Sequence, residues 1–368
     1  SSSFILSLAI LFSGTALAHH SEAPHFDKSK PVTIEGVVSD FQLVNPHASL
    51  YIDVTDENGE TVKWNCEMHA GSTMLRTGWT QDTFKIGAQI IVQGSAARRD
   101  PVGCLYDSGV LADGTEINRD GTIKTGSGDV AVDALGATAM QYIAEGERSI
   151  FGNWKSPEFG YGAGGARVNF PIAIGNYIPG EGLEGHPLGR YAEFLTEMGT
   201  ETSLKYDERF DDPALLCSPG SITRAWSAPS GTSEITQIDN QIIIKHEYMD
   251  TVRVVYMDGR DHPQEGEFGF TGHSVGHFEG DDLVINTRNF SAGVLVPHPG
   301  VLHSNQLMID ERISVSEDGS VLTHKYSAMD PLFFTKPITG TKDWDRTDLP
   351  LAEYNCVELG GVNNQRTE

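Results

Sequence analysis

Apolar and polar side chains alternate along much of the first third of the chain, which is typical of strands that bury one face. Five segments carry this pattern: 31–41, 48–54, 60–66, 84–93 and 104–112. Residues 71–79 interrupt it and predict a short helix ahead of the fourth strand. Five short strands with one helix at this place follow the order of an OB-like barrel. We therefore predict an OB-like β domain over residues 19–112.

The same alternation dominates the chain from residue 233 onward. Seven segments carry it: 233–239, 241–248, 251–257, 273–278, 282–289, 306–316 and 321–328. Turn sequences such as Glu279-Gly280-Asp281 separate neighbouring segments, so an antiparallel meander is expected. We predict a mainly β fold here, a calycin-like antiparallel β-barrel over residues 166–360 that could enclose a small apolar ligand. A β-sandwich is the alternative, because periodicity does not separate the two.

Residues 113–165 lie between these two domains and are rich in glycine and polar side chains, which predicts a linker. Apolar residues recur at helical spacing over 129–147 and predict a short helix within it. A second helix is expected over 187–210, where Asp211-Asp212-Pro213 would end it.

An apolar run opens the chain and is followed by Ala16-Leu17-Ala18. A short apolar core before an A-x-A site is typical of a secretory signal peptide, so residues 1–18 are expected to be removed and His19 to become the N-terminus. The run is shorter than the roughly twenty residues of a membrane span. We therefore expect a periplasmic or secreted protein with no membrane insertion after signal cleavage.

The chain of 368 residues has a formal net charge of −25 at pH 7. Such a charge repels nucleic acids and anionic lipid surfaces, so neither is expected as a partner. Acidity of this size is typical of a solubility device and says little about the fold. The sequence does not define an oligomeric state.

Four cysteines in an exported chain favour disulfide bonds. We predict Cys66–Cys104 and Cys217–Cys356, since each pair then lies within one expected domain. A metal cluster of Cys66, Cys104 and His69 is the alternative, although an oxidising compartment disfavours free thiols.

Short motifs in both halves resemble exported bacterial proteins of unknown function. In the first half they are His19-His20-Ser21, Phe26-Asp27, Pro31-Val32-Thr33, Gly36-Val37-Val38, Asn45-Pro46-His47-Ala48 and Gly78-Trp79-Thr80. This set resembles a family of small exported domains that begin with His-His-Ser after the signal. In the second half they are Tyr256-Met257-Asp258-Gly259-Arg260, His262-Pro263, Gly272-His273-Ser274-Val275-Gly276 and Glu279-Gly280-Asp281. These resemble a second exported β-rich type that is often joined to the first. Neither resemblance implies an activity.

His19 and His47 are the candidate metal ligands. As an N-terminal residue, His19 would offer both its α-amine and its imidazole, and a further imidazole completes a nitrogen ligand set suited to Cu(II). His47 follows Pro46 just ahead of an expected strand and is the best candidate for that third nitrogen. The alternative is that His47 only caps the entry to the strand.

The candidate catalytic residues are Arg253, His273, His277 and Glu311, on consecutive expected strands of the second half. Residues two apart on a strand share a face, so His273 and His277 are expected on one face, as an acid and a base in an interior pocket. Surface ion pairs and hairpin turns are the alternative interpretation of the charged residues around them.

Three functions fit these observations. The chain lacks a Walker A loop, H-E-x-x-H and C-x-x-C, and its G-x-S-x-G sequence at residues 272–276 begins an expected strand instead of joining a strand to a helix, which disfavours the common hydrolases and nucleotide enzymes. The first hypothesis is an exported protein that binds a small molecule and Cu(II). The second is a lyase, isomerase or hydratase that uses histidine and carboxylate groups in the barrel. The third is an envelope or assembly subunit that makes contacts through strand edges.

Overall fold

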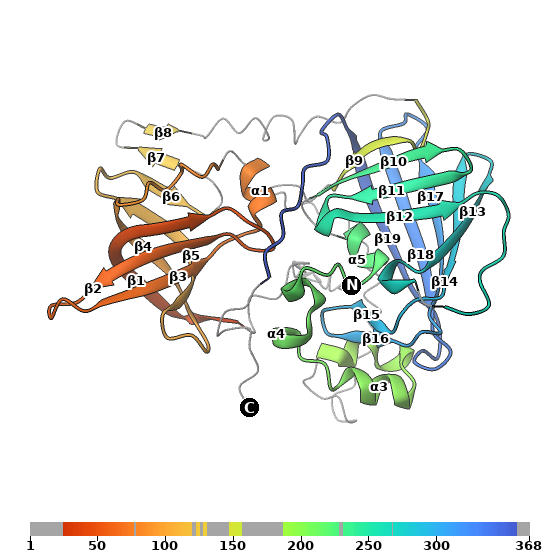
Figure 1. Ribbon diagram of the computed structural model, residues 1–368, viewed down its shortest axis with the longest axis horizontal. Helices are drawn as coiled ribbons and strands as arrows, with labels where there is room; N and C mark the ends of the chain where they lie inside the picture. The colour runs from red at the N-terminus through yellow and green to blue at the C-terminus, as the bar shows by residue number, and fades with distance from the viewer. Residues whose placement is uncertain are drawn as a thin grey trace, which may run out of the picture.

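The computed structural model describes residues 25–76, 79–119, 123–125, 128–130, 147–156, 187–227, 231–266 and 268–358. The expected signal peptide, His19 and nearly all of the helix predicted over 129–147 lie outside these residues. Two β structures make up most of the described chain, and Figure 1 shows them side by side.

The N-terminal structure is the OB-like barrel that the alternation predicts. Its elements are β1 (Phe26–Gln42), β2 (Ser49–Thr55), β3 (Thr61–Glu67), α1 (Gly71–Arg76), β4 (Gln89–Ala97) and β5 (Gly103–Leu111). The strands follow the order β3-β2-β1-β4-β5, and β3 also pairs in parallel with β5, so the five strands close on themselves. Three short strands extend the sheet beyond β5: β6 (Glu116–Asn118), β7 (Ile123–Thr125) and β8 (Gly128–Val130). The strand expected over 84–93 begins later, at Gln89, because turns occupy the residues before it.

Inward side chains of these strands form one apolar core, which includes Leu50, Ile52 and Val92. The Cys66–Cys104 disulfide lies in this core and joins directly paired residues of β3 and β5. The predicted pairing is confirmed, and it crosslinks the two strands whose parallel pairing closes the barrel.

The C-terminal structure is a closed nine-stranded barrel, which confirms the predicted barrel over the sandwich alternative. Its strands are β9 (Gly152–Lys155), β10 (Thr232–Ile238), β11 (Gln241–His246), β12 (Thr251–Tyr256), β13 (His273–Glu279), β14 (Asp282–Arg288), β17 (Met308–Val315), β18 (Val321–Met329) and β19 (Ile338–Thr347). Two features differ from the expected meander. β12 and β13 pair in parallel, because residues 257–272 carry the chain back across the outside of the barrel. β9 lies in the expected linker, yet it closes the barrel between β10 and β19.

β9 is held in the barrel wall by its tryptophan. The fully buried Trp154 lies under the guanidinium of Arg346 on β19, 4.2 Å from the ring centroid. Arg346 also donates hydrogen bonds to the carbonyls of Ser149 and Phe151, which come just before β9. The first and last strands of the barrel are therefore joined by backbone pairing and by this stacked pair.

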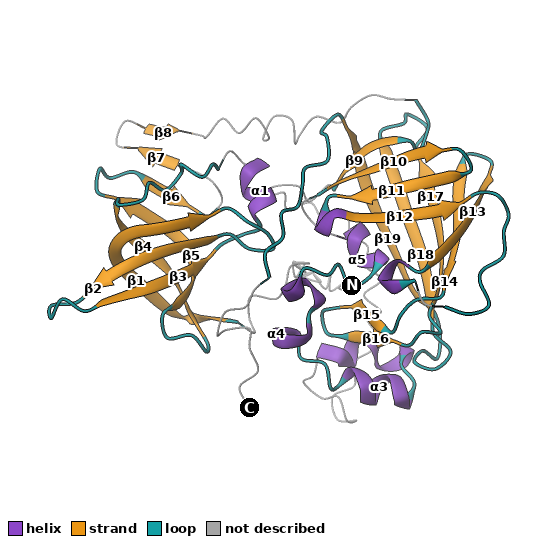
Figure 2. Cartoon of the chain, viewed as in Figure 1, coloured by secondary structure: helices purple, strands orange, loops and turns teal. Residues whose placement is uncertain are grey.

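Short helices and one small hairpin cover one end of the barrel (Figure 2). They are η1 (Pro187–Phe194), α3 (Glu197–Ser203), α4 (Glu208–Asp211), η2 (Pro213–Leu216), α5 (Ile222–Ser227), η3 (Tyr248–Asp250), η4 (Gly269–Thr271) and the strands β15 (Gly293–Val296) and β16 (Val301–His303). The single helix predicted over 187–210 is wrong. The chain forms three pieces there, because Thr196 and Asp207 cap new helices with their side chains.

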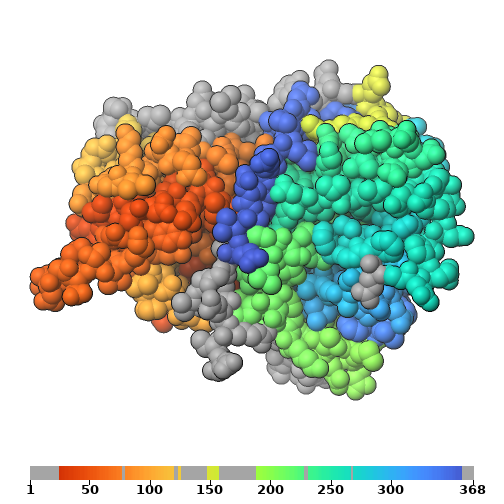
Figure 3. All heavy atoms as spheres, in the orientation of Figure 1, coloured from red at the N-terminus to blue at the C-terminus, as the bar shows by residue number. Residues whose placement is uncertain are grey.

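The C-terminal strap, residues 348–358, runs along the boundary between the two structures (Figure 3). Asn45 of the N-terminal structure pairs with its backbone at Asn355 and Val357. The Cys217–Cys356 disulfide ties the same strap to the helical cover of the barrel, which confirms the second predicted pairing. Within the described residues, no helix combines the length and the apolar character that crossing a membrane requires.

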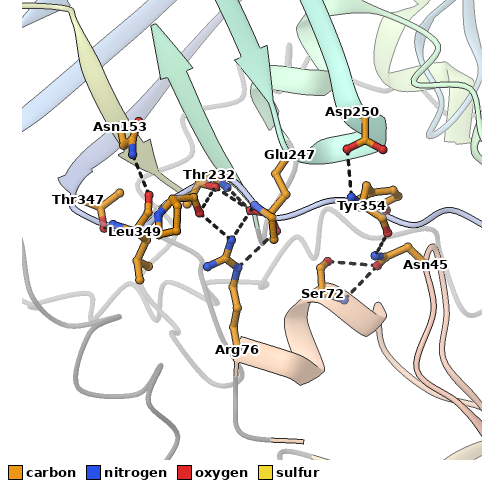
Figure 4. Close-up of polar contacts among 12 residues, drawn as sticks. Asn45, Ser72, Arg76, Asn153, Thr232, Glu247, Asp250, Thr347, Leu349 and Tyr354 are labelled. Carbon is orange, nitrogen blue, oxygen red and sulfur yellow. Dashed lines mark hydrogen bonds and ion pairs between the residues drawn. The ribbon is translucent and has the colours of Figure 1, made fainter. Parts of the chain in front are cut away.

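Figure 4 shows the polar contacts at this boundary. Arg76, the last residue of α1, reaches Glu247 on the barrel side with two nitrogen–oxygen contacts, and Glu247 is 1% exposed. Thr232 also donates its hydroxyl to Glu247 at 2.6 Å. The side-chain amide of Asn45 bonds the carbonyl of Tyr354 and accepts from Ser72 on α1. The two structures are thus joined by buried polar contacts at a helix end and along the strap.

Candidate functional site

The four candidate catalytic residues do not form the expected common pocket. Arg253 and Glu311 lie inside the barrel, His273 is buried at 7% exposure against its outer wall, and His277 is exposed. The reason is an offset of one residue on β13: Ser274, not His273, pairs beside Val255 and faces inward with Arg253. Because side chains alternate along a strand, this offset moves both histidines to the outer face.

Inside the barrel, Arg253 and Glu311 form a doubly hydrogen-bonded ion pair at 2% and 0% side-chain exposure. Arg253 also donates to the hydroxyls of Ser274 at 2.9 Å and Thr287 at 2.8 Å. His324 contacts the same carboxylate at 2.8 Å through Nε2. Burial alone would raise the pKa of Glu311, but Arg253 and His324 outweigh it and lower that pKa to about 2.

Aromatic side chains surround this interior network. Trp226 of α5 stacks on His324 with ring centroids 4.6 Å apart and also contacts His246 and Trp344. Burial, and after it the charges of Arg253 and His324, lowers the pKa of His246 to about 3, so His246 is neutral near pH 7. Its Nδ1 lies 2.7 Å from the hydroxyl of Ser233. The polar groups of the interior therefore bond mainly to one another.

On the outer wall, His273 is one member of a chain of four polar side chains. Its Nδ1 lies 3.0 Å from Nδ1 of His262, which comes from the crossover between β12 and β13. Nε2 of His262 lies 2.8 Å from Oδ1 of Asn286 on β14. The amide nitrogen of Asn286 donates to Asp310 on β17. Three neighbouring strands and the crossover loop thus place these four groups in line.

One hydrogen lies between the two Nδ1 atoms of His262 and His273. Two Nδ1 atoms at hydrogen-bond distance require one donor and one acceptor. Because His262 faces the amide oxygen of Asn286 through Nε2, that nitrogen carries the hydrogen and Nδ1 of His262 accepts. His273 therefore donates from Nδ1, which leaves a lone pair on its Nε2.

Aromatic and charged residues of the second-half motifs surround His273. Tyr256 stacks on its ring with centroids 5.1 Å apart, and Phe268 lies 5.5 Å away. The guanidinium of Arg260 lies over the Tyr256 ring, 3.8 Å from its centroid, and pairs with Asp258. Burial, and after it the neighbouring His262 and Arg260, lowers the pKa of His273. The ring is therefore neutral near pH 7 and can act as a base.

Gly272 lies at the end of the crossover loop, directly before His273 at the start of β13. It has a φ of +61°, and a Cβ there would lie 2.7 Å from the carbonyl oxygen of Arg288. Only glycine fits such a position without strain.

A depression of about 540 Å³ lies against the same crossover loop and the end of β14, lined by Gln264, Glu265, Gly266, Asn289, Asn305 and Gln306. All of its side chains are polar.

In the N-terminal structure, His47 lies just ahead of β2, as predicted. Its Nδ1 donates to the carbonyl oxygen of Met68 at 3.1 Å and lies 3.5 Å from a carboxylate oxygen of Glu67. His25 at the start of β1 lies near enough for its pKa to respond to His47. Burial, followed by His47 and Arg99, lowers the pKa of His25 to about 4. Among the described residues, no three His, Cys, Asp or Glu side chains are placed to hold a metal ion.

Comparison with known families gives one match. Residues 8–105 match a family of unknown function, DUF6152. This range ends in β5 and contains His19, His47 and the Asn-Pro-His motif. No curated protein matches the chain. The resemblance of the second half, and the joining of two families in one chain, stay predictions.

Several residues of these networks were not among the candidates from the sequence, and they include His324, Asn286 and Asp310. Alternation could have indicated His324, which lies two residues from the inward Leu322 on a predicted strand. Asn286 and Asp310 have ordinary outer-face positions, and only the cross-strand register places them opposite each other.

Proposed function

We propose that the protein is an exported acid–base enzyme of the lyase, isomerase or hydratase class, with Nε2 of His273 as its general base. The observation that carries this proposal is the contact between the two Nδ1 atoms of His262 and His273. This contact keeps the hydrogen of His273 on Nδ1 and leaves Nε2 as the basic nitrogen. The apolar leader of the sequence supports export, and two disulfides are compatible with an extracellular location.

The expected chemistry is proton transfer at carbon or at water. Nε2 takes a proton from a carbon next to a carbonyl, or from a water that adds to a double bond, and the ring becomes a cation. The same nitrogen then returns the proton to the product or to its leaving group, which restores the neutral ring. The polar lining of the neighbouring depression favours a small polar substrate.

The barrel interior is a weaker candidate for this chemistry or for a small apolar ligand. Arg253 directs its guanidinium hydrogen bonds to Glu311, Ser274 and Thr287. Three tryptophans, Trp154, Trp226 and Trp344, fill space in the same barrel at 1% exposure or less. A ligand there would have to displace these contacts.

Hydrogen–deuterium exchange tests the proposal without knowledge of the natural substrate. Small hydroxy acids, keto acids and hydroxy ketones are incubated in D₂O, and loss of the proton signal next to the carbonyl is followed by NMR. We expect exchange with the wild-type protein and a loss of about 100-fold or more in His273→Gln. His277→Gln is the matched control and should exchange at the wild-type rate, because the His277 side chain is 64% exposed and pairs with Glu279 on the surface.

The pH dependence gives a second measurement. A general base works when it is unprotonated, so the rate should rise with pH through the lowered pKa of His273 and reach its plateau near neutral pH. Exchange by His273→Gln at the wild-type rate would contradict the proposal. So would the failure of the wild-type protein to exchange any compound of the panel.

A second candidate function is Cu(II) binding by His19 and His47. Its supporting observation is the bond from Nδ1 of His47 to the carbonyl of Met68. Histidines that bind metals commonly donate their other nitrogen to a carbonyl in this way, which orients the ring. The two ligands would supply an amine and two imidazoles, a set that suits Cu(II).

Calorimetric titration of the protein that starts at His19 tests this function. We expect one Cu(II) per chain, with affinity that decreases below about pH 6–7 as the nitrogens become protonated. A single residue added before His19 should weaken binding sharply, and His47→Gln should do the same. Equal affinity in the extended protein would exclude ligation through the amine.

A further inference from the structure

We infer that Asp310 and Asn286 are positioning residues for His273, because they determine through His262 which nitrogen of His273 carries the lone pair. This inference rests on the proposed function, in which Nε2 of His273 is the base. Neither residue contacts the reacting nitrogen, so their role is to set the direction of the hydrogen bonds along the chain.

The contact between Asp310 and Asn286 sets the direction of these hydrogen bonds. An ionised carboxylate only accepts hydrogen bonds, so the group of Asn286 that faces Asp310 must be its amide nitrogen. The amide oxygen then points the other way, toward His262. Asp310 is exposed on β17, on the outer face of the barrel.

The direction passes next through the two rings. Oδ1 of Asn286 accepts from Nε2 of His262 at 2.8 Å, so Nδ1 of His262 has no hydrogen and accepts from Nδ1 of His273. A neutral histidine without such a partner favours the form with its hydrogen on Nε2, in which Nε2 is not a base. These hydrogen bonds therefore hold His273 in its less common tautomer, the one that the proposed reaction needs.

The scaffold makes this arrangement precise. Asn286 and Asp310 are direct cross-strand partners in the β14–β17 register, and Val275 of β13 is the partner of Asn286 on the other side. All three residues lie on the same outer face as His273, which is two positions before Val275. Tyr256 and Phe268 pack against the His273 ring and restrict its rotation.

The test is the tautomer itself, read by long-range ¹H–¹⁵N NMR of protein labelled at histidine, with His273 assigned by its loss in His273→Gln. In the wild-type protein we expect the hydrogen of His273 on Nδ1. In Asn286→Leu and Asp310→Ala we expect a shift to the Nε2–H form. Asp343→Ala is the matched control, because Asp343 also accepts a hydrogen bond on the outer barrel face but contacts Thr323 instead. It should leave His273 unchanged.

Activity separates this inference from the proposed function. Asp310→Ala should slow deuterium exchange, and Asp310→Asn, which keeps an acceptor oxygen, should slow it less. An Nδ1–H tautomer that persists in both Asn286→Leu and Asp310→Ala would overturn the positioning role and leave the general base intact. A wild-type His273 with its hydrogen on Nε2 would overturn both. A protein with the expected tautomers but no exchange activity would support the positioning chain and reject the proposed enzyme.

Discussion

At the scale of single residues, the barrel encloses a charge network that is costly to break. Glu311 accepts from Arg253 and His324 at 0% side-chain exposure. Removing one partner of a buried pair leaves the other charge without compensation, and this costs more than the pair contributes when intact.

We therefore expect Glu311→Gln to lower the free energy of unfolding by roughly 3–5 kcal/mol. Chemical denaturation measured by tryptophan fluorescence checks this value. Glu279→Gln is the control, since Glu279 pairs with Arg312 on the exposed surface and its loss should have a much smaller effect. Equal losses in both variants would contradict the buried network.

The lowered pKa values of the interior predict a loss of stability in acid. His246 has a pKa of about 3 in the folded protein and 6.5 when unfolded, so the unfolded chain binds its proton first as pH falls. The contribution of neutral His246 to the free energy of unfolding is complete above pH 6.5 and decreases toward pH 3. Glu311 adds a second decrease from about pH 4.5 toward pH 2.

His246→Gln should remove the first of these decreases. Between pH 6.5 and 4.5 the free energy of unfolding of the variant should fall less steeply than that of the wild-type protein, by up to about 1.4 kcal/mol per pH unit. Urea denaturation at a series of pH values measures both slopes. Parallel curves would mean that His246 binds its proton over the same pH range in the folded and the unfolded protein, which would contradict its lowered pKa.

At the scale of elements, the sequence predicts strands well where one face is apolar and the other polar. Residues 31–41 and 251–257 were found in this way and agree with β1 and β12 within a few residues at most ends. β9 was missed because four residues are too few to define a period. β19 was missed because Lys342, Asp345 and Arg346 are buried, which removes the contrast between its faces.

The site shows the same limit. Arg253, His273 and Glu311 were candidates because of their chemistry, but the sequence did not predict which strand face each would occupy. The parallel pairing of β12 with β13 decides this, and it depends on the path of the crossover at residues 257–272. Long-range register therefore determined the part of the site that local pattern could not predict.

The end of α1 gives a prediction for an element. Arg76→Ala removes the partner of Glu247, a carboxylate that is 1% exposed at the boundary of the two structures. We expect thermal unfolding, followed by calorimetry, to separate into two transitions, with the N-terminal structure detaching first. Lys63→Ala, which removes the exposed pair between Lys63 on β3 and Asp53 on β2, should leave a single transition. A single unchanged transition in Arg76→Ala would show that this contact does not couple the two structures.

At the scale of the whole molecule, the C-terminal strap connects the helical cover of the barrel with the N-terminal structure. Cys356 bonds Cys217 near the barrel, while its neighbours Asn355 and Val357 pair with Asn45. The disulfide spans 139 residues, and loops of this length restrict the unfolded chain strongly.

Replacing both cysteines by serine, Cys217→Ser with Cys356→Ser, should lower stability by roughly 3–5 kcal/mol and free the strap. Limited proteolysis should then cut within residues 348–358, where the wild-type protein resists. The pair Cys66→Ser with Cys104→Ser is the control, because it should weaken the N-terminal structure and leave the strap protected. Protection of the strap in both variants would contradict its dependence on Cys356.

The pairing of β9 with β19 also sets an order of events during folding. Residues 153–155 must wait for residues 345–347 before the barrel can close, whereas the strands of the N-terminal structure pair over much shorter separations. Contacts between distant residues form slowly because the loop between them must first be closed. The N-terminal structure therefore folds first, and the barrel remains open until nearly all of the chain has emerged. If the protein is exported as proposed above, this late closure keeps most of the chain unfolded while it crosses the membrane.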